Sequence, residues 1–309
     1  MDFNLNEDQK AFVDLAKQFS DAELAPNAAK WDAEHIFPKD VMAKAGELGF
    51  CGLYSPEEAG GMGMSRLDSS LIFEELAKGC TATTAMLTIH NMATWMIATW
   101  GTEEIKDKWC PGLVMGEQLA SYCLTEPGAG SDAASLRTSA KREGDEYVIN
   151  GSKMFISGAG ETDVLVVMVR TGEPGAKGIS AVVIPADAEG VIYGKAEEKL
   201  GWNAQPTKLI TFDNVRVPVA NLLGKEGQGF SFAMKGLDGG RINIATCSVG
   251  TAQQALDTAL EYMKERSQFG KPLAAFQALQ FKLADMATEL VAARQMVRLA
   301  AFKLDSGDP

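Results

Sequence analysis

Residues 122–132 have the residue types that bring a backbone close to a ligand. They read Tyr-Cys-Leu-Thr-Glu-Pro-Gly-Ala-Gly-Ser-Asp, a glycine-rich loop flanked by the hydroxyls of Thr125 and Ser131. Glycines leave backbone N–H groups open to close approach, and hydroxyls both donate and accept hydrogen bonds. A plain β-turn of proline and glycine is the alternative for such a loop taken alone. No Gly-x-Gly-x-x-Gly follows a strand and opens a helix here, so the loop is not a dinucleotide fingerprint.

The cysteines and histidines do not indicate metal chemistry. The five cysteines lack the spacing of zinc or haem ligands, and only His35 and His90 could join them. We therefore predict no metal site and reduced thiols in the core. The cysteines are Cys51, Cys80, Cys110, Cys123 and Cys247.

Charge and composition limit the partners. The formal net charge is -12, from 41 acidic and 29 basic residues, which argues against binding to nucleic acid or an anionic membrane. With 309 residues and 46% hydrophobic content, we expect a soluble globular protein of two or three domains. The first residues resemble neither a signal peptide nor a transit peptide. We expect a cytoplasmic protein, or a mitochondrial matrix protein whose leader is missing.

Helical periodicity dominates the first part of the chain. Asn6 and Gln9 form a capping-box pattern that predicts a helix start. Further helices are predicted near residues 41–48, 65–78 and 103–113. Residues 81–100 are apolar on nearly all sides, which predicts a buried helix. We assign residues 1–119 to an α-helical N-terminal domain.

Strand patterns replace helical ones after about residue 121. Asn150-Gly151 lies between two apolar runs and predicts a β-hairpin turn, because this dipeptide tolerates positive backbone angles. Strands rich in β-branched residues are expected at 164–169, 179–184 and 209–212. We assign residues 120–225 to a mostly antiparallel middle β domain, which makes the fold class α+β.

Two long helical patterns follow Gly229, and Gly307 is a C-cap signal. We assign residues 226–309 to the first two long helices of a C-terminal helical bundle. Two helices cannot bury apolar stripes on all sides, so we expect a truncated chain or a partner that completes the bundle. The stripes are Val249, Ala252, Leu256, Leu260 and Met263, then Leu279, Leu283, Met286, Leu290, Ala293 and Val297.

Residues 122–132 resemble the signature of the acyl-CoA dehydrogenase family almost letter for letter. The likeness continues, in the same order, at residues 150–157, 199–202, 212–218 and 266–272. It covers essentially the whole chain. It implies an α-helical domain, a middle β domain and a C-terminal four-helix bundle.

The resemblance implies FAD as the cofactor. Thr125 would bond the pyrimidine edge of the isoalloxazine, and Ser131 would lie near the diphosphate and the CoA ligand. Phe155 would lie against the ring, although a hairpin core residue is the alternative, and Ser157 would lie near flavin N5. The implied FAD-binding set is Tyr122, Leu124, Thr125, Gly130, Ser131, Phe155, Ile156, Ser157, Arg266 and Gln277.

Two members of that set imply a homo-oligomer. The residues that match Arg266 and Gln277 contact the FAD of a neighbouring subunit in the family, which forms a dimer of dimers. Guanidinium suits this role because it bonds phosphate oxygens in bidentate fashion. The alternatives are a dipole-complementing cation for Arg266 and a solvated helix residue for Gln277.

The resemblance places the CoA and thioester end of the substrate beside residues 237–241. The implied substrate-binding residues are Ser131, Asp238, Gly239, Gly240 and Arg241. Adjacent glycines at a helix start lower stability, so close ligand approach is one reason for them. A helix N-cap at Asp238 is the alternative.

The implied activity is FAD-dependent α,β-dehydrogenation of a short branched acyl-CoA, isobutyryl-CoA, to the 2-enoyl-CoA. Electrons would pass to electron-transfer flavoprotein, as in fatty acid or branched-chain amino acid catabolism. The family's catalytic Glu is expected beyond Pro309, and the alternative position for it is Gly240, so we assign no catalytic residue and expect residues 1–309 alone to be inactive. Should a base lie within the chain, Glu126 and Asp238 would be considered first.

Two other functions remain open from the sequence. One is a flavin oxidase or monooxygenase on the same fold. The other is a non-catalytic FAD- or CoA-binding subunit.

Overall fold

The computed structural model describes residues 4–308, and the chain forms two compact units. One unit comprises Met1–Ala29, Ser65–Ala85 and Arg241–Pro309; the other comprises Lys30–Met64 and Met86–Gly240. Both draw on separated segments, and the domain boundaries after residues 119 and 225 stay predictions. The expected absence of a leader concerns Met1–Asn4, of which only Asn4 lies within the described residues.

The first unit is helical. It contains α1 (Glu7–Phe19), the π-helix η1 (Ser20–Leu24), α4 (Arg66–Gly79) and α8 (Gln277–Asp305), together with the part of α7 (Gly229–Glu265) that begins at Arg241. The predicted capping box is confirmed, because Asn6 Oδ1 accepts from the Gln9 N–H at 2.8 Å and Gln9 Oε1 accepts from the Asn6 N–H at 3.1 Å. Helix α4 packs against both α1 and α8.

A buried ionic group joins α4 to α8. Arg294 Nε donates to Glu74 Oε1 at 2.7 Å, and Arg298 lies 3.7 Å from the other carboxylate oxygen. Arg294 also donates to Gln253 Oε1 on α7 at 2.6 Å. Gly250 of α7 allows α7 to approach α4 closely, because a Cβ on Gly250 would lie 2.3 Å from the Glu74 carbonyl oxygen.

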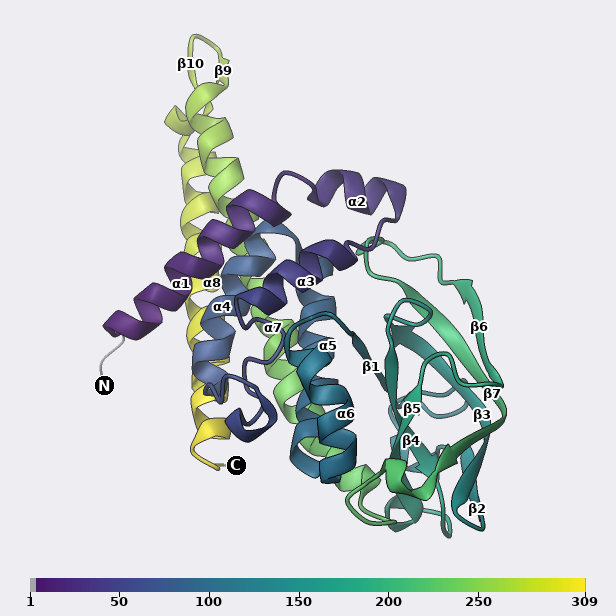
Figure 1. Cartoon of the computed structure of the whole chain (residues 1–309). Coiled ribbons are helices and arrows are strands. Elements are labelled where there is room, and N and C mark those ends of the chain that lie inside the picture. Colours follow the sequence, from purple (N-terminus) through teal and green to yellow (C-terminus); the bar gives the residue numbers. More distant parts are fainter. Residues whose placement is uncertain (1–3, 309) are drawn as a thin grey trace. The chain divides into compact units, whose positions relative to one another are not determined.

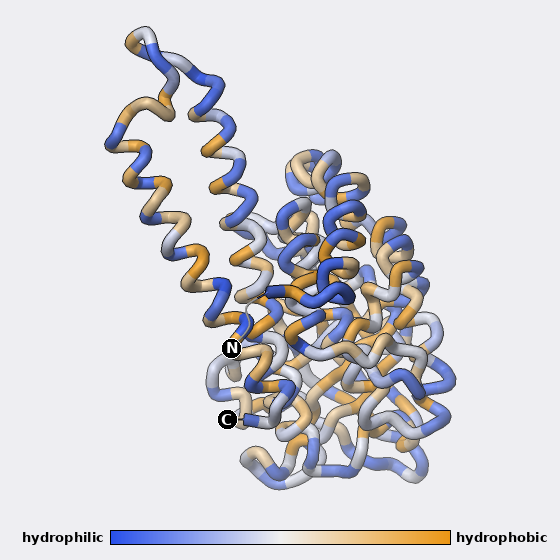
Figure 2. The backbone as a smooth tube through the Cα atoms, turned by 90° about the vertical axis from the view of Figure 1, so that its left-hand side faces the viewer, coloured by the Kyte–Doolittle hydropathy of each residue, from blue (hydrophilic) through white to orange (hydrophobic). Residues whose placement is uncertain are grey.

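The hairpin of α7 and α8 leaves apolar side chains exposed. Figure 2 shows apolar positions recurring along both of its helices. The predicted stripe is only partly open, since Leu290 is buried whereas Met286 is 53% exposed. At the tip, the strands β9 (Ser267–Gln268) and β10 (Lys271–Pro272) pair through a turn at Phe269 and Gly270, both at positive φ (Figure 1). The other exposed large apolar residues of the hairpin are Ile244, Leu260, Tyr262, Phe269, Phe281, Val291, Met296, Leu299, Phe302 and Leu304.

The first part of the second unit is helical. Its helices are α2 (Ala28–Glu34), α3 (Lys39–Glu47), η2 (Glu57–Ala59), α5 (Thr81–Trp100) and α6 (Glu103–Val114), and α2 and α5 each begin within a segment of the first unit. The predicted burial of α5 is confirmed, since most of its side chains are inaccessible. His90 on α5 is fully buried and bridges two segments: its Nδ1 accepts from the Ala120 N–H at 3.1 Å, and its Nε2 lies 2.9 Å from the Leu113 carbonyl oxygen.

An eight-stranded sheet forms the rest of this unit (Figure 1). Its order is β6-β7-β3-β2-β4-β5-β8, with β1 paired to β4 in parallel. Most other pairs are antiparallel, as expected for an α+β fold. The strands are β1 (Ala120–Cys123), β2 (Ser139–Glu143), β3 (Glu146–Ser157), β4 (Val164–Arg170), β5 (Ile179–Pro185), β6 (Val191–Ala196), β7 (Thr207–Pro218) and β8 (Leu222–Leu223). The short 3-10 turns η3 (Ala133–Ser135), η4 (Ala176–Gly178) and η5 (Val219–Asn221) belong to its connections, and η6 (Leu273–Ala275) precedes α8 in the first unit.

The predicted hairpin turn at Asn150-Gly151 is wrong. Strand β3 runs through both residues and pairs with β7 on either side, with a register shift between Ile149 and Gly151. Asn150 instead exchanges hydrogen bonds with Asn214 of β7, at 2.9 and 3.2 Å. The dipeptide therefore marks a β-bulge, another position that needs permissive backbone angles.

Within residues 4–308, no helix is long and apolar enough to cross a membrane.

Candidate active site

The glycine-rich segment forms an open turn after β1. The N–H of Glu126 donates to the Ala129 carbonyl at 3.0 Å, and the N–H of Ala129 donates back at 3.1 Å. A Cβ added to Gly128 or Gly130 would meet no atom within 4 Å. The backbone at these glycines is therefore accessible to a ligand, as the sequence predicts.

Two hydrogen bonds attach this segment to β3. The Met154 N–H donates to the Thr125 carbonyl oxygen at 2.8 Å, and Ser121 Oγ donates to the Ser157 carbonyl oxygen at 2.7 Å. The structure thus brings Thr125 close to the strand that carries Phe155. Ser157 is half-buried two residues further on.

Phe155 has an unusual backbone and an open ring. Its φ is 58°, in the left-handed region that non-glycine residues seldom adopt, and the β3–β7 register shifts between Lys153 and Ile156. This bulge directs the side chain outward, leaving it 57% exposed, whereas Ile156 is 2% exposed and packs in the sheet core. Strained backbone is concentrated at functional sites, because binding there compensates for the strain.

Three other members of the predicted FAD set fall at different kinds of position. The side chain of Leu124 is buried in the core, so that Leu124, like Ile156, can face a ligand only with its backbone. Tyr122 is half-buried, and its hydroxyl lies 3.4 Å from the Ala233 carbonyl oxygen. Ser131 is exposed at the end of the turn.

A buried ion pair underlies the turn, and sequence reasoning gave it no role. Lys153 Nζ lies 2.8 Å from Glu126 Oε1, with side-chain exposures of 0% and 7%. Burial raises the pKa of the Glu126 carboxyl, but the Lys153 ammonium and donors at Arg137 and Thr138 outweigh it and leave that pKa below its usual value. Glu126 is therefore a held anion and unsuited to be a proton acceptor. The sequence signal for this pair was a lysine within the predicted strand, directly before the apolar run Met154-Phe155-Ile156.

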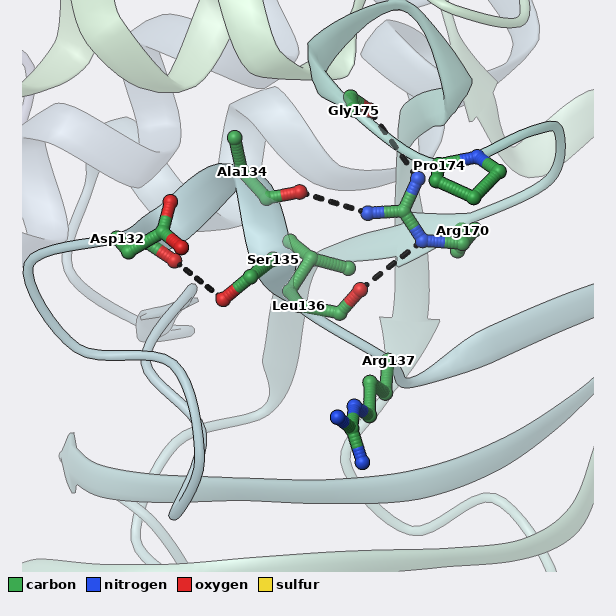
Figure 3. Close-up of a pocket in the computed structure, with 8 residues that line it drawn as sticks. All are labelled: Asp132, Ala134, Ser135, Leu136, Arg137, Arg170, Pro174 and Gly175. Atoms are coloured by element: carbon green, nitrogen blue, oxygen red, sulfur yellow. Dashed lines mark hydrogen bonds between the residues drawn. The ribbon is translucent and has the colours of Figure 1, made fainter.

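A pocket of about 570 Å³ lies beside the turn (Figure 3). Arg170 forms one wall, where it donates to the carbonyl oxygens of Leu136, Ala134 and Gly175 at 2.8 to 3.1 Å. The Arg137 guanidinium is drawn apart from these bonds, on an exposed residue. The pocket lining therefore includes both the exposed Arg137 side chain and the exposed Asp132 side chain. Its full lining is Asp132, Ala134, Ser135, Leu136, Arg137, Arg170, Pro174 and Gly175.

The predicted substrate residues lie within a helix rather than at its start. Helix α7 begins at Gly229 and continues through Asp238, Gly239 and Gly240, so the alternative of an N-cap at Asp238 is wrong. Gly240 lies close to Met92, since a Cβ on Gly240 would lie 3.4 Å from Met92 Sδ. Asp238 and Arg241 are exposed, and Gly239 is buried.

Arg266 and Gln277 belong to the helical unit. Arg266 follows the last residue of α7, and Gln277 is the first residue of α8; both are exposed. The hairpin brings their segments near each other, because the Leu273 N–H donates to the Arg266 carbonyl oxygen at 2.8 Å. Their role toward FAD stays a prediction.

Neither metal nor thiol chemistry is indicated by the geometry. Among residues 4–308, no three His, Cys, Asp or Glu side chains are grouped as a metal site requires. All five cysteines are buried and free, and burial raises the pKa of Cys123, at the end of β1, to about 12.

Comparison with known families gives matches along the whole chain. Residues 6–117 match the acyl-CoA dehydrogenase N-terminal domain, residues 121–215 its middle domain and residues 227–309 its C-terminal domain. The chain belongs to the acyl-CoA dehydrogenase family. Members of this family are FAD-dependent oxidoreductases, so the recognition, fold class and enzyme class predicted from sequence are confirmed.

Individual relatives agree. Isobutyryl-CoA dehydrogenase of Bos taurus is 56% identical over 300 residues, which cover 97% of this chain and 72% of the bovine protein. The short-chain specific acyl-CoA dehydrogenase of Clostridium acetobutylicum is 42% identical, covering 100% of this chain and 82% of that protein. The solved structure of butyryl-CoA dehydrogenase from Megasphaera elsdenii superposes with a TM-score of 0.95 at 41% identity, and the match covers 100% of this chain and 82% of that one.

Proposed function

We propose that this family member binds FAD and dehydrogenates a short branched acyl-CoA, isobutyryl-CoA, to the 2-enoyl-CoA. The observation that carries the proposal is the open glycine turn hydrogen-bonded to the bulge that presents Phe155. The choice of acyl group rests on the 56% identity to isobutyryl-CoA dehydrogenase. An apolar pocket separates acyl groups that differ by one methylene by only about 1 to 3 kcal/mol.

The residues present fit FAD. When bound, FAD supplies the hydride acceptor of the reaction. The turn offers accessible backbone at Gly128 and Gly130, and Phe155 offers an exposed aromatic face to a planar ring. We assign Thr125, Ser131 and Ser157 to polar contacts at this site.

The α-proton of a thioester is weakly acidic, so its removal needs a carboxylate base and hydrogen bonds on the carbonyl oxygen. Glu126 is committed to three donors and is not that base. Asp238, Gly239, Gly240 and Arg241 are proposed to line the CoA side.

We further propose a dimer of dimers in which Arg266 and Gln277 reach the FAD of a neighbouring subunit. Both side chains are exposed, as a contact to a second subunit requires. Electron-transfer flavoprotein is the proposed electron acceptor. The proposed location is the cytoplasm or the mitochondrial matrix.

The test is acyl-CoA-dependent reduction of an artificial electron acceptor by the FAD-saturated gene product. We expect kcat/KM to be about tenfold higher for isobutyryl-CoA than for butyryl-CoA, the scale on which an apolar pocket separates acyl groups. Turnover with oxygen in place of the acceptor would indicate an oxidase instead. FAD binding without turnover of any acyl-CoA would indicate a non-catalytic subunit.

Phe155→Gly tests the ring contact. Glycine relieves the positive φ, so the free energy of unfolding of the apoprotein should stay within about 1 kcal/mol of the original. Loss of the aromatic face should weaken FAD binding about tenfold, measured by flavin fluorescence titration. Asn214→Gly is the matched control, because Asn214 also has positive φ (54°) and belongs to β7 rather than to the turn or to β3. Equal FAD affinity in Phe155→Gly and Asn214→Gly would reject the contact.

A further inference from the structure

We propose that Glu126 and Lys153 are positioning residues for FAD: their ion pair holds Thr125 and the Phe155 bulge in one fixed arrangement. This inference rests on the proposed FAD site and adds two residues to it that do not themselves touch the cofactor. It begins from the contacts of a single ammonium group.

The Lys153 ammonium holds the residues on both sides of Thr125. Its Nζ donates to the Leu124 carbonyl oxygen at 3.1 Å and to Glu126 Oε1 at 2.8 Å. The next residue, Met154, donates its N–H to the Thr125 carbonyl at 2.8 Å. Three consecutive residues of the turn are thus bonded to two consecutive residues of β3.

The same lysine fixes the start of the bulge. Lys153 is the last residue in register with Ile210 before the shift, and register resumes at Ile156. Its side chain points inward at 0% exposure, whereas Phe155, two residues later, is 57% exposed. A lysine locked to the turn therefore limits how far the strained segment can relax.

The Glu126 carboxylate extends the connection to a third segment. Its Oε2 accepts from the Arg137 N–H at 2.6 Å, and its Oε1 accepts from the Thr138 N–H at 2.9 Å. These amides precede β2, and Arg137 itself lines the pocket. One carboxylate thus fixes the turn, β3 and the pocket wall together.

Stability alone does not explain a buried ion pair. Desolvation offsets much of the attraction, and well-packed apolar residues of similar size often give equal or higher stability. Charged, hydrogen-bonded partners differ from apolar ones in accepting only a narrow range of geometry. The ion pair is therefore expected to fix the placement of Thr125 and Phe155 rather than to raise the stability of the fold.

The decisive variant is Glu126→Gln/Lys153→Met in the holoprotein, which removes both charges together. We expect the apoprotein to unfold within a few degrees of the original, FAD to bind about tenfold more weakly, and the visible circular dichroism of bound flavin to change. An exposed pair on the same sheet provides the control: Arg216 lies 2.8 Å from Glu143, and Glu143→Gln should leave FAD affinity and spectrum unchanged.

Glu126→Asp decides the matter should the double variant fail to fold. It keeps both charges but withdraws the carboxylate by one methylene from its donors, so a several-fold loss of FAD affinity with an altered flavin spectrum is expected. A folded variant of either kind with the original FAD affinity and flavin spectrum would overturn the inference. If the original protein binds no FAD, the proposed function itself fails, which separates the two failures.

Discussion

Replacing Glu74 with glutamine is expected to lower the free energy of unfolding by about 3 to 5 kcal/mol, the usual loss when one partner of a buried ion pair is removed. Glu74 is 7% exposed and is the carboxylate that Arg294 and Arg298 of α8 both approach. Glutamine would remove the one carboxylate that forms ion pairs with both guanidinium groups. Urea unfolding followed by far-ultraviolet circular dichroism measures the effect.

The control for this prediction is Glu261→Gln on α7. Glu261 pairs with Lys264 at 2.6 Å, but both side chains are more than half exposed. Exposed helical pairs of this kind contribute about 0.3 to 0.5 kcal/mol. A loss below about 1 kcal/mol in Glu74→Gln, similar to the control, would contradict the importance assigned to the buried group.

Acid is expected to destabilise the fold through His90 by about 3 kcal/mol. Burial lowers the pKa of His90 from 6.5 to about 4, and the hydrogen bond from the Ala120 N–H requires an unprotonated Nδ1. The unfolded chain therefore binds the proton more readily than the folded one. This contribution is complete above pH 6.5 and is lost as the pH falls through about 4.

The measurement is the free energy of unfolding against pH, together with the nuclear magnetic resonance titration of the imidazole. In His90→Gln the slope between these pH values should become shallower, since the titrating group is gone. The chain has only two histidines, so the signals are readily assigned. A His90 titration midpoint near 6.5 in the folded protein would show the prediction to be wrong.

Regular elements follow from the sequence because their causes are local. The capping box at Asn6 and Gln9 and the apolar surface of α5 each depend on residues within a few turns of one another. The glycine turn was likewise predicted as an accessible backbone, and the family resemblance implied that Thr125 and Phe155 serve the same flavin. Local physics was sufficient at these positions.

Long-range packing decided the features that the sequence misplaced. Asn150-Gly151 has the residues of a turn, but Asn214, 64 positions later, pairs with it inside the sheet. Gly239 and Gly240 suggested a helix start, but α7 runs through both residues, and Gly240 lies beside Met92. The connection through Glu126 and Lys153 joins three segments, and no periodicity in one segment reveals it.

The burial of Lys153 has a consequence for covalent labelling. Among residues 4–308, Lys153 is the one lysine with a fully buried side chain. An amine-directed reagent therefore reaches Lys153 only when the turn separates from β3. Exposed lysines such as Lys264 react without any opening. The ratio of the two modification rates therefore reports how often the turn separates from β3.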